Sequence, residues 1–117
     1  MDDEKRGFRE LIVNALEEWF GPCAARLASR WHGGKFILQP ENETLAAKEI
    51  DVEVFFHKIV MVRESLRVLE QRINSHPKLN DEDRLQLQQY VSRCYGTLTT
   101  FNVLFQDERD KFIGQKS

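Results

Sequence analysis

The sequence predicts an all-α fold, in which a long antiparallel helical hairpin packs with one or two N-terminal helices as a three- to four-helix bundle. Two apolar stripes with helical spacing and a proline-containing turn between them are the main observations. The stripes comprise Phe55, Ile59, Val62, Leu66, Leu69 and Ile73, then Leu87, Val91, Cys94, Leu98, Phe101 and Phe105. Because both alternate steps of four and three residues, a chain that reverses between them would zip two helices along one seam.

The 117 residues fit one helical domain, 1–117, with an N-terminal helical segment at 3–32, a connector at 33–50 and the helical hairpin at 51–112. The N-terminal segment is expected to form a helix from about residue 3 to residue 20. A second short helix, or a kinked continuation of the first, should run over 22–31, because Pro22 suits a first helical turn. The glycine pair Gly33-Gly34 would end it.

The connector allows two interpretations. Lys35–Leu38 could be a short extended segment, and the sequence leaves open whether residues 35–48 are ordered. The alternation of Ile50, Val52 and Val54 with polar residues is a strand signal, so 49–56 could pair with 35–38 as a β-hairpin. We favour a helix from Val52 because the stripe of helical spacing begins at Phe55.

The two helices of the hairpin are expected at about 52–75 and 81–106. Asp51 and Asn80 are the predicted N-caps, whose side-chain oxygens would accept backbone N–H groups. Pro77 disfavours helical geometry at the preceding residue and so predicts the turn. Gly96 and the threonines that follow lower helix propensity, but we expect packing of the seam to override them.

Composition excludes several function classes. The formal net charge is −2, so the chain lacks the basic excess that is typical of nucleic-acid or anionic-membrane binding. The acidic start and the lack of a long apolar run predict a cytoplasmic protein with no membrane contact. Cys23 and Cys94 are interpreted as small buried hydrophobes, the latter in the seam.

No residue pattern predicts catalysis, a cofactor or a metal site. Glu53 and His57 share a helix face, but the Glu-x-x-His spacing of di-iron bundles is absent, so we interpret them as a solvated face. The histidines and cysteines are scattered singly. We therefore expect a protein that is not an enzyme.

The predicted function is a protein–protein interaction module, such as a scaffold, adaptor or regulatory subunit. It would act through the hairpin surface on a protein partner of unknown identity and would self-associate, for example as a homodimer. The candidate interface residues lie off the expected seam: Arg63, Arg67, Tyr90 and Tyr95.

Two alternatives remain. The first is a nucleic-acid-binding regulator that uses the arginines of the hairpin, although acidic residues are interleaved among them. The second is a small apolar ligand-binding bundle. Its aromatic pocket would lie between Trp19, Trp31, Phe55 and Phe101.

Overall fold

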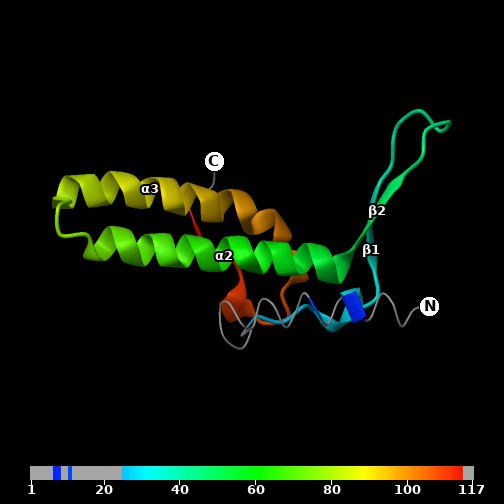
Figure 1. The fold of residues 1–117 in the computed structure, drawn as a ribbon, viewed down its shortest axis with the longest axis horizontal. Helices are drawn as coiled ribbons and strands as arrows, with labels where there is room; N and C mark the ends of the chain where they lie inside the picture. The colour runs from blue at the N-terminus through cyan, green and yellow to red at the C-terminus, as the bar shows by residue number, and fades with distance from the viewer. Residues whose placement is uncertain (1–6, 9–10, 12–24, 115–117) are drawn as a thin grey trace.

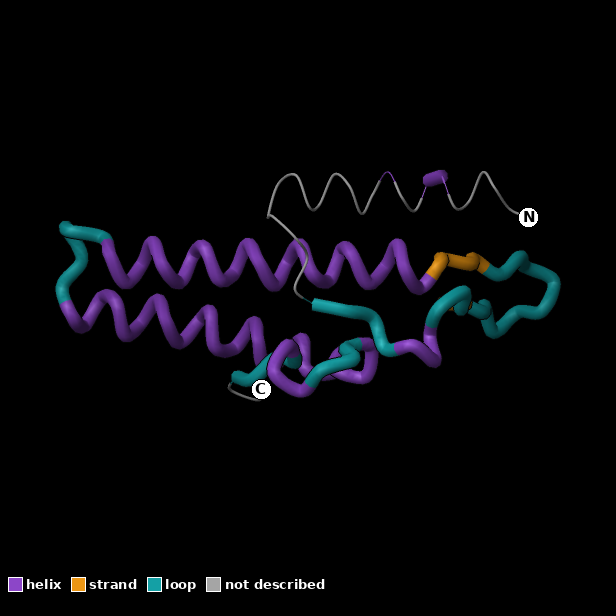
Figure 2. Tube along the Cα trace, turned by 90° about the horizontal axis from the view of Figure 1, so that it is seen from below, coloured by secondary structure: helices purple, strands orange, loops and turns teal. Residues whose placement is uncertain are grey.

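The computed structural model describes residues 7, 8, 11 and 25–114 (Figure 1). The elements in chain order are η1 (Ser29–Trp31), β1 (Lys35–Leu38), β2 (Lys48–Asp51), α2 (Val52–Ser75), α3 (Asp81–Leu98), η2 (Thr99–Leu104) and η3 (Glu108–Asp110), where η denotes a 3₁₀-helix. The long helices α2 and α3 lie side by side (Figures 1 and 2). The fold is a small mixed α/β fold, so the expected all-α three- to four-helix bundle is wrong.

The two strands form an arm, residues 35–51, that projects from the N-terminal end of α2 (Figure 1). They pair antiparallel, with Lys35 opposite Asp51 and Leu38 opposite Lys48. A two-stranded hairpin alone is marginally stable in water. Here the ring of Phe36 packs against that of Phe55 on α2, with 4.3 Å between the ring centroids, and this contact ties the arm to the helix.

The β-hairpin interpretation of the connector was therefore correct for 35–38, but its partner strand ends at Asp51 and the helix starts at Val52. The tip of the arm also has a defined turn. The Asn42 side-chain oxygen accepts hydrogen bonds from the backbone N–H and the hydroxyl of Thr44, at 3.0 and 2.7 Å. Such local bonds are typical of Asx turns.

The start of α2 agrees with the expected residue but not with the expected cap. The Asp51 side chain accepts no cap hydrogen bond. Instead the backbone N–H of Val52 donates to the carbonyl oxygen of Gly34 at 3.0 Å. The Glu53 carboxylate also accepts the N–H of Gly33 at 2.9 Å, so the solvated-face interpretation missed its structural role. Gly33 adopts φ +78°, a conformation that favours glycine.

The turn between the helices agrees with the sequence. α2 ends at Ser75, and His76 has extended backbone geometry before Pro77. Asn80 is the N-cap of α3, because its side-chain oxygen accepts the N–H of Asp83 at 2.8 Å. The three carboxylates of the first turn of α3 complement the positive end of the helix.

α3 ends at Leu98, and the expected helix to residue 106 is wrong because Thr99–Leu104 is a 3₁₀-helix. The hydroxyl of Thr99 donates to the carbonyl of Gly96 at 2.7 Å. Tertiary partners then take the later carbonyls. Val103 accepts from the indole N–H of Trp31 at 2.9 Å, and Leu104 accepts from a backbone N–H at 2.8 Å. The low helix propensity of Gly96 and of the threonines that follow therefore prevails over the apolar stripe, and the end of η2 is bonded to the segment before β1.

The predicted short helix over 22–31 is also wrong within the described residues. Leu27 forms an isolated antiparallel bridge with Phe105, and the N–H of Gln106 donates to the carbonyl of Arg26 at 2.9 Å. Of residues 25–31, which the structure describes, only Ser29–Trp31 is helical, as one 3₁₀ turn. Gly7, Phe8 and Leu11 have helical geometry, while the rest of the expected helix over 3–20 lies outside the described residues.

The core lies at the arm end of the hairpin, opposite the Pro77 turn. It comprises Ala25, Val52, Phe56, Ile59, Val60, Leu104, Phe105 and Phe112. Phe56 is the most deeply buried large side chain among the described residues, at 1% exposure. Its ring meets that of Phe105 edge-on at 5.3 Å. The Asn102 side chain fastens the C-terminal segment, 105–114, by bonding both the N–H and the carbonyl of Phe112.

The seam between α2 and α3 is rotated from the expected stripes. Leu69 on α2 is 48% exposed, and Cys94 on α3 is exposed instead of buried. Their neighbours turn inward: the Tyr95 hydroxyl donates to the Glu70 carboxylate at 2.5 Å. Further towards the turn, the side chain of Gln88 donates to that of Asn74 at 2.6 Å. Of the expected stripes, Ile59, Ile73 and Val91 remain buried, whereas a second set lies exposed at the edge of the seam: Val62, Leu69, Leu87 and Cys94.

Candidate functional site

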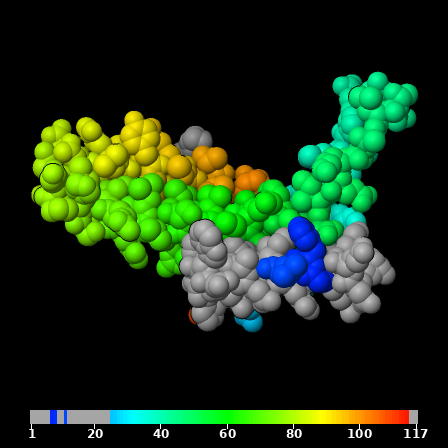
Figure 3. All heavy atoms as spheres, viewed as in Figure 1, coloured from blue at the N-terminus to red at the C-terminus, as the bar shows by residue number. Residues whose placement is uncertain are grey.

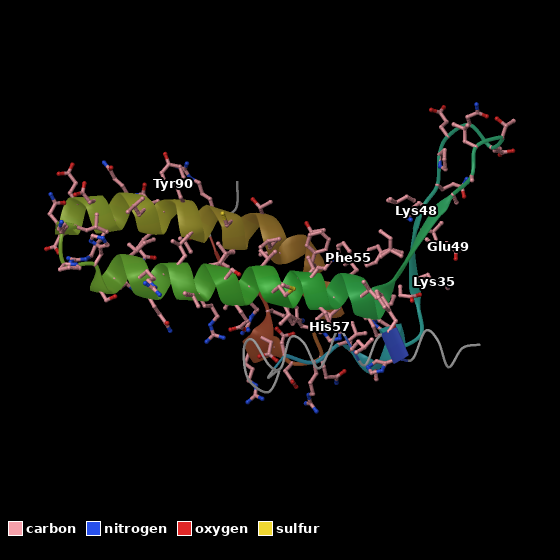
Figure 4. All side chains as sticks on the ribbon, in the orientation of Figure 1. Lys35, Lys48, Glu49, Phe55, His57 and Tyr90 are labelled. Carbon is pink, nitrogen blue, oxygen red and sulfur yellow. The ribbon has the colours of Figure 1, made fainter. Side chains whose placement is uncertain are left out.

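A small groove lies where the C-terminal segment, 105–114, packs against the hairpin. Its volume is about 240 Å³, and it is lined by Arg63, Arg67, Glu70, Tyr95, Lys111, Phe112 and Ile113. Three of the four candidate interface residues therefore come together here. The fourth, Tyr90, lies elsewhere on α3 (Figure 4).

Arg63 is mostly buried, with 11% of its side chain exposed. It forms an ion pair with Glu64, and its Nε donates to the backbone carbonyl of Asp110 at 3.1 Å. Its terminal nitrogen lies 3.8 Å from the carboxylate of Asp110, which is itself buried. A buried carboxylate needs such a partner. Arg63 therefore fixes the C-terminal segment to α2.

Tyr95 and Glu70 form the wall of the groove between the helices. Burial raises the pKa of the Tyr95 phenol above its ordinary value of 10.0, and the hydrogen bond and negative charge of Glu70 raise this pKa further. The folded protein therefore holds the Tyr95 proton more tightly than the unfolded chain does. The ring of Phe112 packs at 6.1 Å from that of Tyr95.

Stability should therefore fall as pH rises above about 10, because the unfolded chain then releases the Tyr95 proton while the folded protein keeps it. The test is urea unfolding between neutral pH and pH 12 for the wild type and for Tyr95→Phe. The variant should lose about 1–2 kcal/mol at neutral pH, since Glu70 loses its donor. It should also show a shallower decline at high pH. Equal declines in both proteins would contradict the role of Tyr95.

The other cations of the groove are also paired. Arg67, with 54% of its side chain exposed, lies 3.6 Å from the Glu64 carboxylate. The Lys111 ammonium contacts Glu108 at 2.6 Å. Since Glu70 adds a further negative charge inside the groove, no strong positive field remains there. The groove is sized for a side chain rather than for a large ligand.

A second surface lies along the opposite side of the hairpin. We call it the open side, defined by Val62, Leu69, Leu87 and Cys94, which are exposed. The pairs on each helix are seven residues apart and so share a helix face. On each helix these residues are displaced from the seam by a rotation in the same direction about that helix's own N-to-C axis. Because the two helices are antiparallel, such residues lie on the same side of the hairpin. Both pairs are rotated away from Glu70 and Tyr95, and hence away from the C-terminal segment.

The open side leads into an aromatic stack at the base of the arm. Phe55 contacts Phe36 at 4.3 Å and Phe101 at 5.4 Å between ring centroids. Figure 4 shows Phe55 between the two helices, close to where the strands begin. Near the middle of α3, Tyr90 is 63% exposed and its ring lies 5.5 Å from the Arg93 guanidinium. An apolar line thus follows the hairpin from the arm to Leu87.

Sequence reasoning missed the open side because it placed these apolar residues inside the seam. Glu70, Gln88 and Tyr95, adjacent to the expected stripes, gave a signal that polar partners could compete for the seam. Cys94 is a free, exposed thiol, so its buried interpretation is wrong, while Cys23 lies outside the described residues.

Among the described residues, no group of three or more histidine, cysteine, aspartate or glutamate side chains is placed to hold a metal ion. Over the same residues, no helix has the length and apolarity needed to cross a membrane. In the expected aromatic pocket, Phe55 and Phe101 contact each other directly, and Trp19 lies outside the described residues.

Comparison with known proteins gives one family match. Neither the curated proteins nor the solved structures contain a match to the chain. The model of a domain of unknown function (DUF8685) matches residues 22–111, which include the arm, both long helices and all of the groove lining except Phe112 and Ile113. Since this match spans most of the chain, the protein belongs to the DUF8685 family.

Proposed function

We propose that the protein is a non-catalytic protein-interaction module whose docking surface is the open side of the helical hairpin. The observation that carries the proposal is the exposure of apolar side chains along two long helices. Val62, Leu69 and Leu87 are 45, 48 and 39% exposed. Aligned apolar residues on a rigid scaffold mark interaction sites more often than scattered ones do.

A protein helix is the partner that fits this surface. An amphipathic helix can lay apolar residues spaced three, four and seven apart along the line that joins the arm base to the Pro77 turn. Tyr90 stands at the rim, and exposed aromatic residues are enriched at interfaces. The mechanism would be apolar burial between preformed helices, with no chemical step.

The described contacts favour this function over the two alternatives. A nucleic-acid site needs arginines that are free to reach phosphates. Arg63 is mostly buried against Asp110, and Arg67 lies near Glu64. For a small apolar ligand, the groove offers about 240 Å³, and four of its lining side chains are charged. An apolar site would want a larger and less polar cavity.

The proposal is tested by site-specific photo-cross-linking in the source cells. A photoreactive side chain at Leu69 or at Leu87 should give the same cross-linked protein, because both positions lie on the open side. Matched controls are Gln71 and Gln89, which are exposed on other faces of the same helices. Products that do not differ between these two sets of positions would count against the open side as the docking surface.

Two charge substitutions add a quantitative prediction. Leu69→Glu and Leu87→Glu should each change the free energy of unfolding by no more than about 0.5 kcal/mol, since both side chains are substantially exposed. Each should abolish the cross-link formed from the other position. Urea unfolding and the cross-linking yield are the two measurements. A large loss of stability would instead show that these residues belong to the core.

A further inference from the structure

We infer that two copies of the chain pair through the outer edge of β1, so that their arms form a four-stranded antiparallel sheet. This inference concerns the arm and does not depend on the docking surface proposed above. Figure 3 shows the arm standing clear of the helices, so that a second arm can approach it. The occupant of the edge is a second copy, for three reasons.

The first reason is the backbone geometry of the edge. The N–H of Val52 donates to Gly34, so these residues form a hydrogen-bonded pair of the ladder. Hydrogen-bonded and non-hydrogen-bonded pairs alternate in antiparallel ladders. Ile37 and Glu49, which are opposite each other, therefore form a non-hydrogen-bonded pair. The backbone N–H and C=O groups of Ile37 therefore point outwards from the β1 edge, and those of Glu49 point outwards from the β2 edge.

The second reason is charge, which distinguishes the two edges. When the same edge strand of two copies pairs around a two-fold axis, residues whose backbone N–H and C=O groups point outwards must lie opposite residues of the same kind. On β2 these are Glu49 and Asp51, so pairing of β2 with its copy would place carboxylates opposite carboxylates. Acidic residues on an edge strand are a known protection against such pairing. The β2 edge is therefore closed to a second copy.

The β1 edge has the complementary pattern. An axis through Ile37 places Ile37 opposite its own copy, Phe36 opposite Leu38 of the second copy, and Lys35 opposite Gln39. No like charges meet in this register. Lys35 remains within reach of Glu49 of its own chain, at 3.3 Å. Charge thus permits self-pairing on this edge and opposes it on the other.

The third reason is the apolar surface that pairing would cover. Ile37 and Leu38 are 57 and 59% exposed, although both belong to a strand. Phe36, Leu38 and Ile50 share one face of the arm, because side chains alternate along strands and opposite residues share a face. Leu38 of the second copy would extend the row that Ile50 and Phe36 begin. The paired strands are short, so the dimer should be weak and concentration-dependent.

Ile37→Pro tests the inference in the full-length protein. Proline at this position removes only the outward N–H, and proline is tolerated where the N–H of an edge strand faces solvent. The matched control is Glu49→Pro, which makes the same change on the other edge. Sedimentation equilibrium should show a monomer–dimer equilibrium in the wild type and in Glu49→Pro. The dissociation constant should rise at least about tenfold in Ile37→Pro.

A wild-type protein that remains monomeric at every concentration would overturn the inference. Weakening of the dimer in both proline variants would also overturn it, because this result would indicate pairing of β1 with β2. Far-ultraviolet circular dichroism checks that each variant is folded. If a proline variant is unfolded, the cysteine variants below decide the question.

Single cysteines give that second measurement, in a Cys23→Ser, Cys94→Ser background. In a hydrogen-bonded antiparallel pair the Cα atoms are about 5.5 Å apart, within the range that a disulfide spans. Ile37→Cys should therefore form a disulfide-linked dimer under mild oxidation, and Glu49→Cys should not. Cross-linking from Glu49→Cys alone, or from neither variant, would overturn the inference.

Discussion

Replacing Phe56 with alanine is expected to lower the free energy of unfolding by about 3–5 kcal/mol. Phe56 is 1% exposed, and its ring packs edge-on against Phe105, which in turn packs against Phe112 at 5.5 Å. The deletion would open a cavity where α2 meets the C-terminal segment, 105–114. Because whole domains have a stability of about 5–15 kcal/mol, the variant should be close to unfolding at room temperature.

Urea unfolding monitored by circular dichroism measures this loss. Phe56→Leu is the matched control for size, and should lose less because it leaves a smaller cavity. Val68→Ala is a control for position, since Val68 is 47% exposed and should change stability by no more than about 0.5 kcal/mol. Similar losses in Phe56→Ala and Val68→Ala would contradict the placement of the core.

Arg63→Met is expected to lower the free energy of unfolding by about 3 kcal/mol, because it leaves the buried Asp110 carboxylate without its cation. The arginine also donates to the Asp110 carbonyl at 3.1 Å, so the variant should release η3 as well. Proteolysis near residues 108–112 should become faster in the variant. Unfolding in urea and limited proteolysis measure the two effects.

The double variant Arg63→Met, Asp110→Leu separates charge from packing. Replacing both members of a buried ion pair by apolar residues is often nearly neutral. The double variant should therefore recover most of the stability that Arg63→Met loses. Equal stability of the single and double variants would show that the ion pair contributes little and that the stem of Arg63 is what matters.

The helical hairpin could be predicted from the sequence because its signals are local. The Pro77 turn, the Asn80 cap and the stripes specify two helices, and the structure begins and ends α2 at the expected residues. The end of α3 could not be predicted in this way. The carbonyls of Val103 and Leu104 are bonded by the Trp31 indole and by the backbone N–H of Ala28, about 70 residues earlier in the chain.

The arm was visible only as an ambiguous signal. Four residues such as Lys35–Leu38 carry too little periodicity to distinguish strand from loop, and the ring contact that ties them to α2 joins Phe36 to Phe55 in a separate element. The stripe that starts at Phe55 was a stronger signal and led to an all-α prediction. A short strand that feeds directly into a helix is easily hidden by the helix that follows.

The open side exists because each long helix is rotated about its own axis relative to the seam that the stripes predict. The stripes alone could not specify this rotation. Apolar spacing shows which residues share a face, but Glu70 and Gln88 reveal the true seam only through partners on the other helix. Arg63, Arg67 and Tyr95 could be named as candidate interface residues because polar residues beside a stripe are visible in the sequence, but no pattern predicted that they line one groove. Val62, Leu69, Leu87 and Cys94 could not be named in this way, because a stripe of this kind predicts a core.

The hydrogen bonds across the seam favour one register of α2 against α3. Sliding one helix past the other by a turn would separate the partly buried Tyr95 hydroxyl from Glu70, whereas a purely apolar seam would tolerate such a slip. The spacing between Leu69 and Leu87 is thereby held constant. A partner helix would therefore meet exposed apolar residues at fixed distances from one another. It would bind only if the spacing of its own apolar residues matched those distances.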